Sequence, residues 1–201
     1  MSIIELKGVT KEYGQGHTLV QALKPTDFQL EAGQFVAIIG PSGSGKTTFL
    51  TLLGHLQTPS KGQILLRGKD TSQLKEKERA ALRFNDFGFI LQASNLIPFL
   101  KIEDQFQLID RLSKKERTDL DSLIELLDLK DTLKQYPKEL SGGERQRAAI
   151  ARALYNSPDI ILADEPTASL DTERARRVVH LLKEVTQKFN KSVVMITHDT
   201  R

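Results

Sequence analysis

An eight-residue segment near the start of the chain has the residue types of a loop that binds phosphate. The segment is Gly40-Pro41-Ser42-Gly43-Ser44-Gly45-Lys46-Thr47, and it fits the pattern G-x-x-x-x-G-K-[ST] at every position. Its glycines let backbone N–H groups close around phosphate oxygens, and a helix that follows adds the positive end of its dipole. We expect the Lys46 ammonium to reach the outer phosphates and the Thr47 hydroxyl to bind Mg²⁺.

The residues on either side of this loop favour that interpretation. The apolar run 35–39 precedes the loop and is typical of a buried strand, and residues 48–53 are typical of the start of a helix. An ordinary Gly/Ser turn before a helix is the alternative. The agreement of the motif with its flanking strand and helix argues against that alternative.

Polar residues suited to phosphate chemistry also follow two other apolar runs. Asp164 and Glu165 follow residues 160–163, and His198 comes two residues after the run 193–196. Open parallel sheets bind ligands outside the carboxyl ends of their strands, so the three segments predict one site. Asp164 suits a carboxylate that organises Mg²⁺, and Glu165 suits a general base that polarises an attacking water. Adjacent side chains of an extended chain point to different sides, which predicts different roles for the two acids.

Each of these residues also has a simpler interpretation. The Asp164–Glu165 pair could be a solvated acidic loop, and a single histidine at a strand end is usually packed or solvated. Gln92 is a polar residue after the apolar run 87–91, and Tyr13 is an aromatic residue in a strand-turn region. Residue type alone gives neither Gln92 nor Tyr13 a function.

A second segment has the properties of an anion site. Ser141 and Glu144 form the capping-box pattern of a helix that continues through residues 148–150. Gly142 and Gly143 lie in the first turn of that helix, where each glycine costs about 1 kcal/mol relative to alanine. Bare backbone N–H groups at the start of a helix can approach a phosphate closely, so this segment predicts a second phosphate-binding surface.

Hydrophobic periodicity predicts the elements that position these sites. Residues 3–35 favour antiparallel strands, residues 95–155 favour several helices, and strands alternate with helices after Pro158. Residues 113–116 have a capping-box pattern ahead of apolar residues at helical spacing over 120–127, which predicts a helix start there. Continuous apolar strands that alternate with helices indicate an α/β protein with a buried parallel sheet.

Composition limits the possible function classes. The chain has 201 residues, 39% apolar and 27% charged, with a net charge of +3 that is too small to argue for nucleic acid. The absence of cysteine excludes disulfides and thiolate metal sites, and it fits a reducing compartment. We expect no signal peptide at the N-terminus and no membrane span, so any membrane part would belong to another chain.

Taken together, these motifs resemble those of the ATP-binding cassette family, the ATPase subunits of ABC transporters, over essentially the whole chain. Tyr13 matches the aromatic residue that stacks on adenine, Gly40–Thr48 matches Walker A, and Gln92 matches the Q-loop glutamine. Ser141–Gln146 matches the signature, and Asp164 and Glu165 match Walker B with its catalytic glutamate. Ser169-Leu170-Asp171 matches the D-loop, and His198 matches the switch histidine. This sequence ends three residues after His198, whereas family members usually continue through a further strand and helices.

The resemblance implies a fold, an activity and partners. It implies a P-loop NTPase core (RecA-like) over residues 1–94 and 156–201, with an N-terminal antiparallel β subdomain and an inserted helical subdomain over about 95–155, all within one ATPase domain of residues 1–201. It implies hydrolysis of ATP with Mg²⁺ bound by Thr47, Gln92 and Asp164. It also implies a head-to-tail homodimer in the ATP-bound state, in which Ser141, Gly142, Gly143 and Glu144 contact nucleotide held by the other copy. The implied partner is a membrane permease, which the chain would meet at the cytoplasmic face of the cell membrane. The resemblance implies no nucleic-acid partner.

Two stretches narrow the resemblance within the family. Residues 89–100 and 163–171 are similar to those of the lipoprotein-release and macrolide-efflux branch, and in particular to ATPases of haem exporters of Gram-positive bacteria. This likeness implies export or extraction at the membrane, with haem as the cargo. Residues 95–100 follow Gln92 and include apolar side chains, so they lie either at the surface that meets the permease or in the core of the helical lobe.

Three other classes of ATPase or GTPase fit less well. DNA-repair and chromosome-structure ATPases of the superfamily interpose long coiled coils between the two phosphate motifs, but residues 47–140 contain no sustained heptads. Translation-associated members carry two cassettes in one chain. A GTPase needs N-K-x-D, and the nearest match, residues 190–193, lacks the aspartate. The alternative that remains is a soluble ATPase of the superfamily that acts on DNA or ribosomes.

Overall fold

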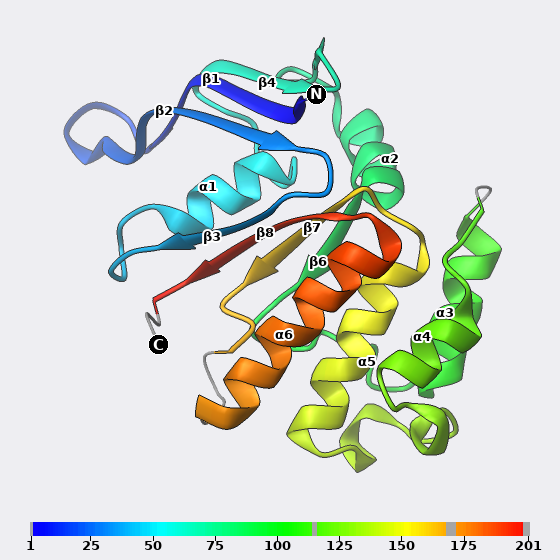
Figure 1. Ribbon diagram of the computed structural model, residues 1–201. Helices are drawn as coiled ribbons and strands as arrows, with labels where there is room; N and C mark the ends of the chain where they lie inside the picture. The colour runs from blue at the N-terminus through cyan, green and yellow to red at the C-terminus, as the bar shows by residue number, and fades with distance from the viewer. Residues whose placement is uncertain (1, 114–115, 168–171, 199–201) are drawn as a thin grey trace.

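The computed structural model describes residues 2–113, 116–167 and 172–198, and within them the strands form two sheets (Figure 1). An antiparallel sheet has the order β2-β1-β4-β5, and a parallel sheet has the order β3-β8-β7-β6. The strands are β1 (Ser2–Tyr13), β2 (Val20–Glu31), β3 (Phe35–Ile39), β4 (Lys61–Leu66), β5 (Lys69–Asp70), β6 (Phe87–Ile90), β7 (Ile160–Asp164) and β8 (Ser192–Thr197). The helices are α1 (Lys46–Leu53), α2 (Glu76–Asp86), α3 (Ile102–Leu112), α4 (Leu120–Leu126), α5 (Gly142–Tyr155) and α6 (Thr172–Phe189), with 3-10 turns η1 (Gly16–Thr18), η2 (Lys130–Thr132) and η3 (Pro137–Glu139).

The parallel sheet is buried on both faces, which explains the continuous apolar runs of its central strands. Ile161 and Val193 pack in one core with α5 and α6. Leu162 and Val194, their neighbours in sequence, pack in a second core with α1 and the antiparallel sheet. Because side chains alternate between the faces of a strand, every position of β7 and β8 except Asp164 is buried, as expected for a parallel sheet covered on both sides. The predicted α/β fold is confirmed.

Helix α1 lies between the two sheets (Figure 1). Its Phe49, Leu52 and Leu53 are buried in the same core as Ile4 and Leu6 of β1. The Phe49 ring also meets Phe28 of β2 edge-on, with ring centroids 5.1 Å apart. The loop that precedes α1 is therefore held between β3 and a helix that is fixed from both sides.

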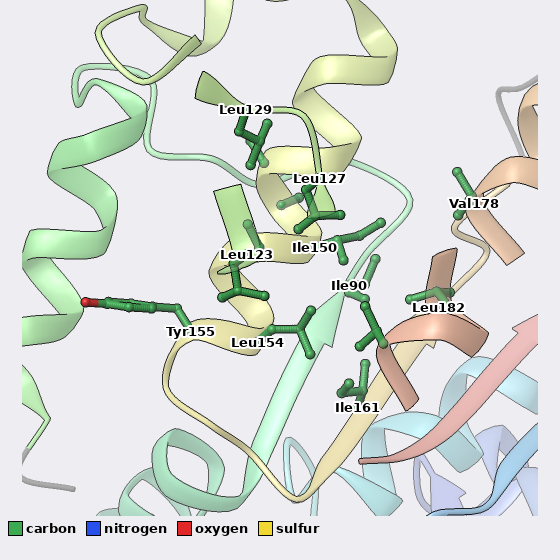
Figure 2. Close-up of a cluster of buried hydrophobic side chains, with 14 of the residues drawn as sticks. Ile90, Leu123, Leu127, Leu129, Ile150, Leu154, Tyr155, Ile161, Val178 and Leu182 are labelled. Atoms are coloured by element: carbon green, nitrogen blue, oxygen red, sulfur yellow. The ribbon is translucent and has the colours of Figure 1, made fainter. Parts of the chain in front are cut away.

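Helices predominate between β6 and β7, as the sequence predicts, and the described residues of 95–155 contain no strand. Figure 2 shows side chains of α4, α5 and α6 converging on Ile90 of β6 and Ile161 of β7. Ile150 and Leu154 of α5 are fully buried in this cluster. Helix α5 thus packs on the parallel sheet as well as on the helices before it, and the division near residues 95 and 155 stays a prediction.

The predicted helix start at residues 113–116 is wrong. Ser113 is the C-terminal cap of α3, and its backbone N–H donates to the carbonyl oxygen of Ile109 at 2.8 Å. Helix α4 begins at Leu120, where the Asp119 carboxylate accepts a hydrogen bond from the Ser122 N–H at 2.9 Å. Asp119 stands next to the first apolar residue of the helical pattern, so it caps the helix more directly than Ser113 does.

The helices built from the described residues are all too short or too polar to cross a membrane.

Candidate active site

A pocket of about 730 Å³ lies at the carboxyl ends of the parallel strands. Its described lining comes from the start of β2, the loop before α1 and the start of α1, the second residue after β6, and the ends of β7 and β8. The lining residues are Val20, Gln21, Ala22, Ser42, Gly43, Gly45, Lys46, Thr47, Thr48, Gln92, Asp164, Glu165 and His198. Segments that are far apart in the sequence therefore meet in one cavity, at the position where parallel sheets bind ligands.

The phosphate loop depends on glycine at a particular position. Gly45 has a φ of +88° and is the N-terminal cap of α1. A Cβ at this position would lie 2.6 Å from the carbonyl oxygen of Ala22. The loop therefore packs against β2 so closely that only a residue without a side chain fits, and it presents the N-terminus of α1 to the pocket.

Lys46 is folded back onto its own loop. Its Nζ donates hydrogen bonds to the carbonyl oxygens of Gly40 at 2.7 Å and Pro41 at 2.8 Å. Ser44 lies beside Gly40, where a Cβ would be 3.2 Å from the Ser44 Oγ. Gly40, Pro41 and Ser44 thus shape the loop without being among the described lining residues of the pocket.

Three oxygen-bearing side chains in the pocket suit a hard cation. Burial raises the pKa of Asp164, the neighbouring Glu165 charge acts in the same direction, and the Lys46 ammonium acts against both. A cation at this place would offset the cost of keeping Asp164 ionised. The Thr47 hydroxyl and the Gln92 amide line the same pocket, and oxygen donors of this kind fit Mg²⁺, which keeps several of its waters.

Glu165 and His198 contact each other directly. The Nδ1 of His198 lies 2.8 Å from Oε2 of Glu165, and the backbone N–H of His198 donates to the same oxygen at 3.4 Å. Glu165 has a φ of +47°, so the chain leaves the extended conformation immediately after Asp164. The alternation expected for an extended chain does not apply there, and both carboxylates line the pocket.

Tyr13 lies close to the pocket but is not among its described lining residues. It pairs across the antiparallel ladder with Val20, which is exposed and does line the pocket. The Tyr13 hydroxyl hydrogen-bonds to Oε1 of Gln57, and the Lys11 ammonium lies 5.3 Å from the ring centroid. Sequence reasoning missed residues 20–22, although the glycines of the short connection, Gly14 and Gly16, could have indicated that Tyr13 faces the start of the next strand.

The second anion motif lies outside this pocket. Ser141 caps α5 as predicted: its hydroxyl accepts from the Glu144 N–H at 3.3 Å, and its own N–H donates to Glu144 Oε2 at 2.7 Å. Ser141, Gly142 and Gly143 border a separate cavity of about 290 Å³ against Val178 and Leu181 of α6. Within one copy, therefore, the described residues do not bring residues 141–144 to the phosphate loop. Residues 169–171, which include the predicted Asp171, lie outside the described residues.

Relatives of known family share this sequence over nearly its full length. The sequence model of the ABC transporter family matches residues 23–168. A protein of Staphylococcus haemolyticus named as a hemin import ATP-binding protein, HrtA, is 44% identical, over 98% of this chain and 91% of its own. An ABC transporter ATP-binding protein of Methanocaldococcus jannaschii, MJ1508, described as uncharacterized, is 43% identical, over 98% of this chain and 89% of its own.

Solved structures agree with the fold. The dimeric structure of MJ0796, described as a bacterial ABC transporter cassette, superposes with a TM-score of 0.86 at 37% identity, over 98% of this chain and 88% of that one. A second MJ0796 structure, a dimeric post-hydrolysis state bound to ADP and Pi, gives 0.85 at 36% identity, with the same coverage. The chain therefore belongs to the ABC transporter family, as an ATP-binding subunit with ATPase activity.

Proposed function

We propose that this chain binds ATP with Mg²⁺ in the pocket at the ends of β3, β7 and β8 and hydrolyses it there to drive a membrane transporter. The observation that carries the proposal is the convergence of the phosphate loop, Gln92, Asp164, Glu165 and His198 on one cavity. A relative in the same family has been solved with ADP and Pi.

The proposed roles follow from the position and chemistry of each group. Lys46 turns from the carbonyls of its own loop to the outer phosphates, and the backbone N–H groups of residues 42–48 surround the remaining oxygens. Glu165 holds the attacking water as general base, and His198, already in contact with Glu165, approaches the transferred phosphate. Tyr13 and Val20, at the mouth of the pocket, form the surface on which adenine stacks.

The Mg²⁺ site would use Thr47, Gln92 and Asp164. All three line the pocket, and the raised pKa of Asp164 marks a carboxylate that a cation would relieve. When bound, the ion supplies positive charge against the phosphate oxygens. Thr47, at the start of α1, and Asp164, at the end of β7, would both hold the ion.

A second copy of the chain would complete the site. Residues 141–144 present backbone N–H groups at the start of α5, away from the phosphate loop of their own copy. Two copies arranged head to tail would bring each of these helix starts onto the nucleotide of the other.

The direct test is the affinity of the purified chain for ATP. We expect Lys46→Ala to abolish binding measured by titration calorimetry, and Glu165→Gln to retain binding while hydrolysis is lost. Lys77→Ala is the matched control, because Lys77 is an exposed lysine on α2 away from the pocket. If Lys46→Ala binds ATP as tightly as the unmodified chain, the phosphate-loop assignment is wrong.

The proposed cargo is hemin, moved outward. Relatives at 42–44% identity are named as hemin import ATP-binding proteins, whereas the likeness of residues 89–100 and 163–171 to haem exporters implies the opposite direction. Growth of the host with the gene deleted, across a hemin series, separates these possibilities. Hemin sensitivity that is rescued by the intact gene, but not by a Glu165→Gln copy, supports export. Loss of growth only when hemin is the iron source supports import, and unchanged growth in both conditions excludes hemin as cargo.

The permease partner would meet the segment after Gln92 at the cytoplasmic face of the membrane. In residues 95–100, Leu96 is buried in the helical core, whereas the Phe99 side chain is 77% exposed. The buried Leu96 therefore fits the core interpretation, and the exposed Phe99 supports the proposal that this segment meets the permease. We expect Phe99→Asp to leave ATP binding intact and to abolish co-purification of the permease; unchanged co-purification would exclude this surface.

A further inference from the structure

Arg152, near the end of α5, holds the loop that follows Gln92. Its guanidinium donates hydrogen bonds to the carbonyl oxygens of Asn95 at 2.6 Å and Ser94 at 3.4 Å. Among the described residues, none of the ion pairs involves Arg152. Burial lowers the pKa of this guanidinium, the only cause of the shift. The arginine is therefore a partly desolvated cation whose partners are two backbone carbonyls.

The loop that Arg152 holds has a defined and unusual shape. Asn95 has a φ of +48°, a conformation that most residues avoid. Two residues after Asn95, the Ile97 N–H donates to Oε1 of Gln105 on α3 at 3.2 Å, and Gln105 is only 2% exposed. The segment is thus clamped between α5 and α3, and Gln92 lies in the pocket just ahead of the clamp.

Helix α5 contacts a second catalytic segment near its other end. The Gln146 side-chain amide donates to the carbonyl oxygen of Pro166 at 3.2 Å, and Pro166 directly follows Glu165. The helix that starts at Ser141 is therefore hydrogen-bonded both to the segment after Glu165 and to the segment after Gln92. A rigid helix that is fully buried at Ile150, between these two contacts, and again at Leu154 keeps their spacing constant.

We infer that Arg152 is a positioning residue for Gln92: it fixes the backbone of residues 94–95 to α5 and so sets where the Gln92 amide stands in the pocket. An arginine suits this task because its planar guanidinium carries several donors in a fixed arrangement that spans two successive carbonyls. A methionine at this position is of similar length and would fill the space, but it has no donor with which to hold the loop. This inference rests on the proposed role of Gln92 at the Mg²⁺ site.

The test is a double-mutant cycle between Arg152→Met and Gln92→Ala, read out as kcat for ATP hydrolysis by the purified chain. If Arg152 acts through Gln92, we expect Arg152→Met to lower kcat about tenfold in the unmodified chain and less than about twofold in the Gln92→Ala background. Arg152→Lys keeps the charge but not the planar group with several donors, so its kcat should lie between those of the unmodified chain and Arg152→Met. A role confined to stability would lower kcat by the same factor in both backgrounds.

Arg83→Met is the matched control. Arg83 also donates to a backbone carbonyl, that of His55 at 2.8 Å, but it lies on α2 and is not among the described lining of the pocket. We expect its kcat to stay within about twofold of the unmodified chain. If Arg152→Met does not fold, Arg152→Lys takes its place in the cycle.

The outcomes separate this inference from the proposed function. If Gln92→Ala lowers kcat but the effect of Arg152→Met is the same in both backgrounds, Arg152 does not act through Gln92 and the inference is overturned. If Gln92→Ala leaves kcat unchanged, the proposed role of Gln92 fails, and the inference fails with it.

Discussion

At the scale of single residues, the pocket depends on backbone conformations that side chains rarely allow. Gly45, next to Lys46, has a φ of +88°, and Glu165 has a φ of +47°. The glycine lets α1 begin against β2, and the turn at Glu165 brings its carboxylate to His198. Non-glycine residues in such conformations cost roughly 1–3 kcal/mol and persist where the surroundings enforce them, most often at functional sites.

Replacing Gly45 tests this packing. We expect Gly45→Ala to lower the free energy of unfolding by about 1–3 kcal/mol and to weaken ATP binding strongly, because the new Cβ would lie 2.6 Å from the Ala22 carbonyl oxygen. Gly68→Ala is the control that separates the effect of backbone strain from the effect on the pocket. Gly68 has a φ of +77°, no heavy atom lies within 4 Å of its Cβ position, and it is not among the described lining residues of the pocket. Urea unfolding and ATP titration of both variants measure the two effects. Normal ATP affinity in a folded Gly45→Ala protein would contradict the proposed geometry.

Asp164 predicts how Mg²⁺ affinity depends on pH. Burial raises the pKa of Asp164, helped by the Glu165 charge, so this carboxyl takes up a proton at a higher pH than an ordinary aspartate. Protons and Mg²⁺ compete for the same oxygens, so Mg²⁺ affinity should start to fall at a higher pH than for an exposed carboxylate site. Titration of Mg²⁺ into the ATP-bound chain at several pH values measures the dependence. Asp164→Asn should remove the part of this dependence that comes from the carboxyl, while the ATP phosphates keep their own. An unaltered dependence in that variant would exclude Asp164 as a ligand.

Residue types indicated most of the predicted pocket, but not its contacts. Lys46 could be selected from the phosphate-loop pattern, and Asp164 and His198 because each follows an apolar strand; the structure places all three in one cavity. The Glu165–His198 contact depends on a positive φ that nothing in the sequence marks. Val20 lines the pocket through strand register, which requires knowing how β1 and β2 pair.

At the scale of elements, the end of α1 is tied to the antiparallel sheet through a buried histidine. His55 is 1% exposed, with Nε2 2.7 Å from the Thr71 Oγ1 and Nδ1 3.2 Å from the Leu53 carbonyl oxygen. Burial lowers the pKa of His55 to about 4, and the positive charges of Arg79 and Arg83 act in the same direction. The ring is therefore neutral in the folded protein at physiological pH.

This histidine makes stability depend on pH. Below a pH of about 6.5 the unfolded chain takes up a proton that the folded chain refuses, so stability is lost as the pH falls from about 6.5 toward 4. We expect the loss to be about 2 kcal/mol at pH 5 relative to pH 7.5. Asparagine tolerates the positive φ of this position, so the His55→Asn protein should lack this pH-dependent loss of stability. Urea unfolding of both proteins at the two pH values provides the comparison, and an equal loss in both would show that His55 is not its source.

Hydrophobic periodicity predicted the elements well where burial is complete. The strands β7 and β8 were predictable because both of their faces are covered, which leaves continuous apolar runs. The start of α4 was mispredicted because the pattern at 113–116 resembles a cap, while the actual cap is Asp119. A capping pattern needs only two residues, so it occurs by chance more often than a buried strand does.

At the scale of the whole molecule, the chain carries two predicted anion-binding surfaces, and within one copy the structure does not bring them together. The phosphate loop faces the pocket at the ends of the parallel strands, and the start of α5 borders a separate cavity beside α6. Solved relatives in the same family are described as dimeric. Periodicity and residue type do not by themselves predict the proposed second copy, because each surface forms from local elements of one chain.

The mass of the Glu165→Gln chain in the presence of ATP and Mg²⁺, measured by light scattering, tests the central claim most directly. The substitution removes the proposed general base and keeps the rest of the pocket, so ATP should persist between two copies. We expect the mass to double when ATP is added, and to remain that of a monomer when Lys46→Ala is combined with Glu165→Gln. A folded Glu165→Gln chain that binds ATP and remains a monomer would contradict the account.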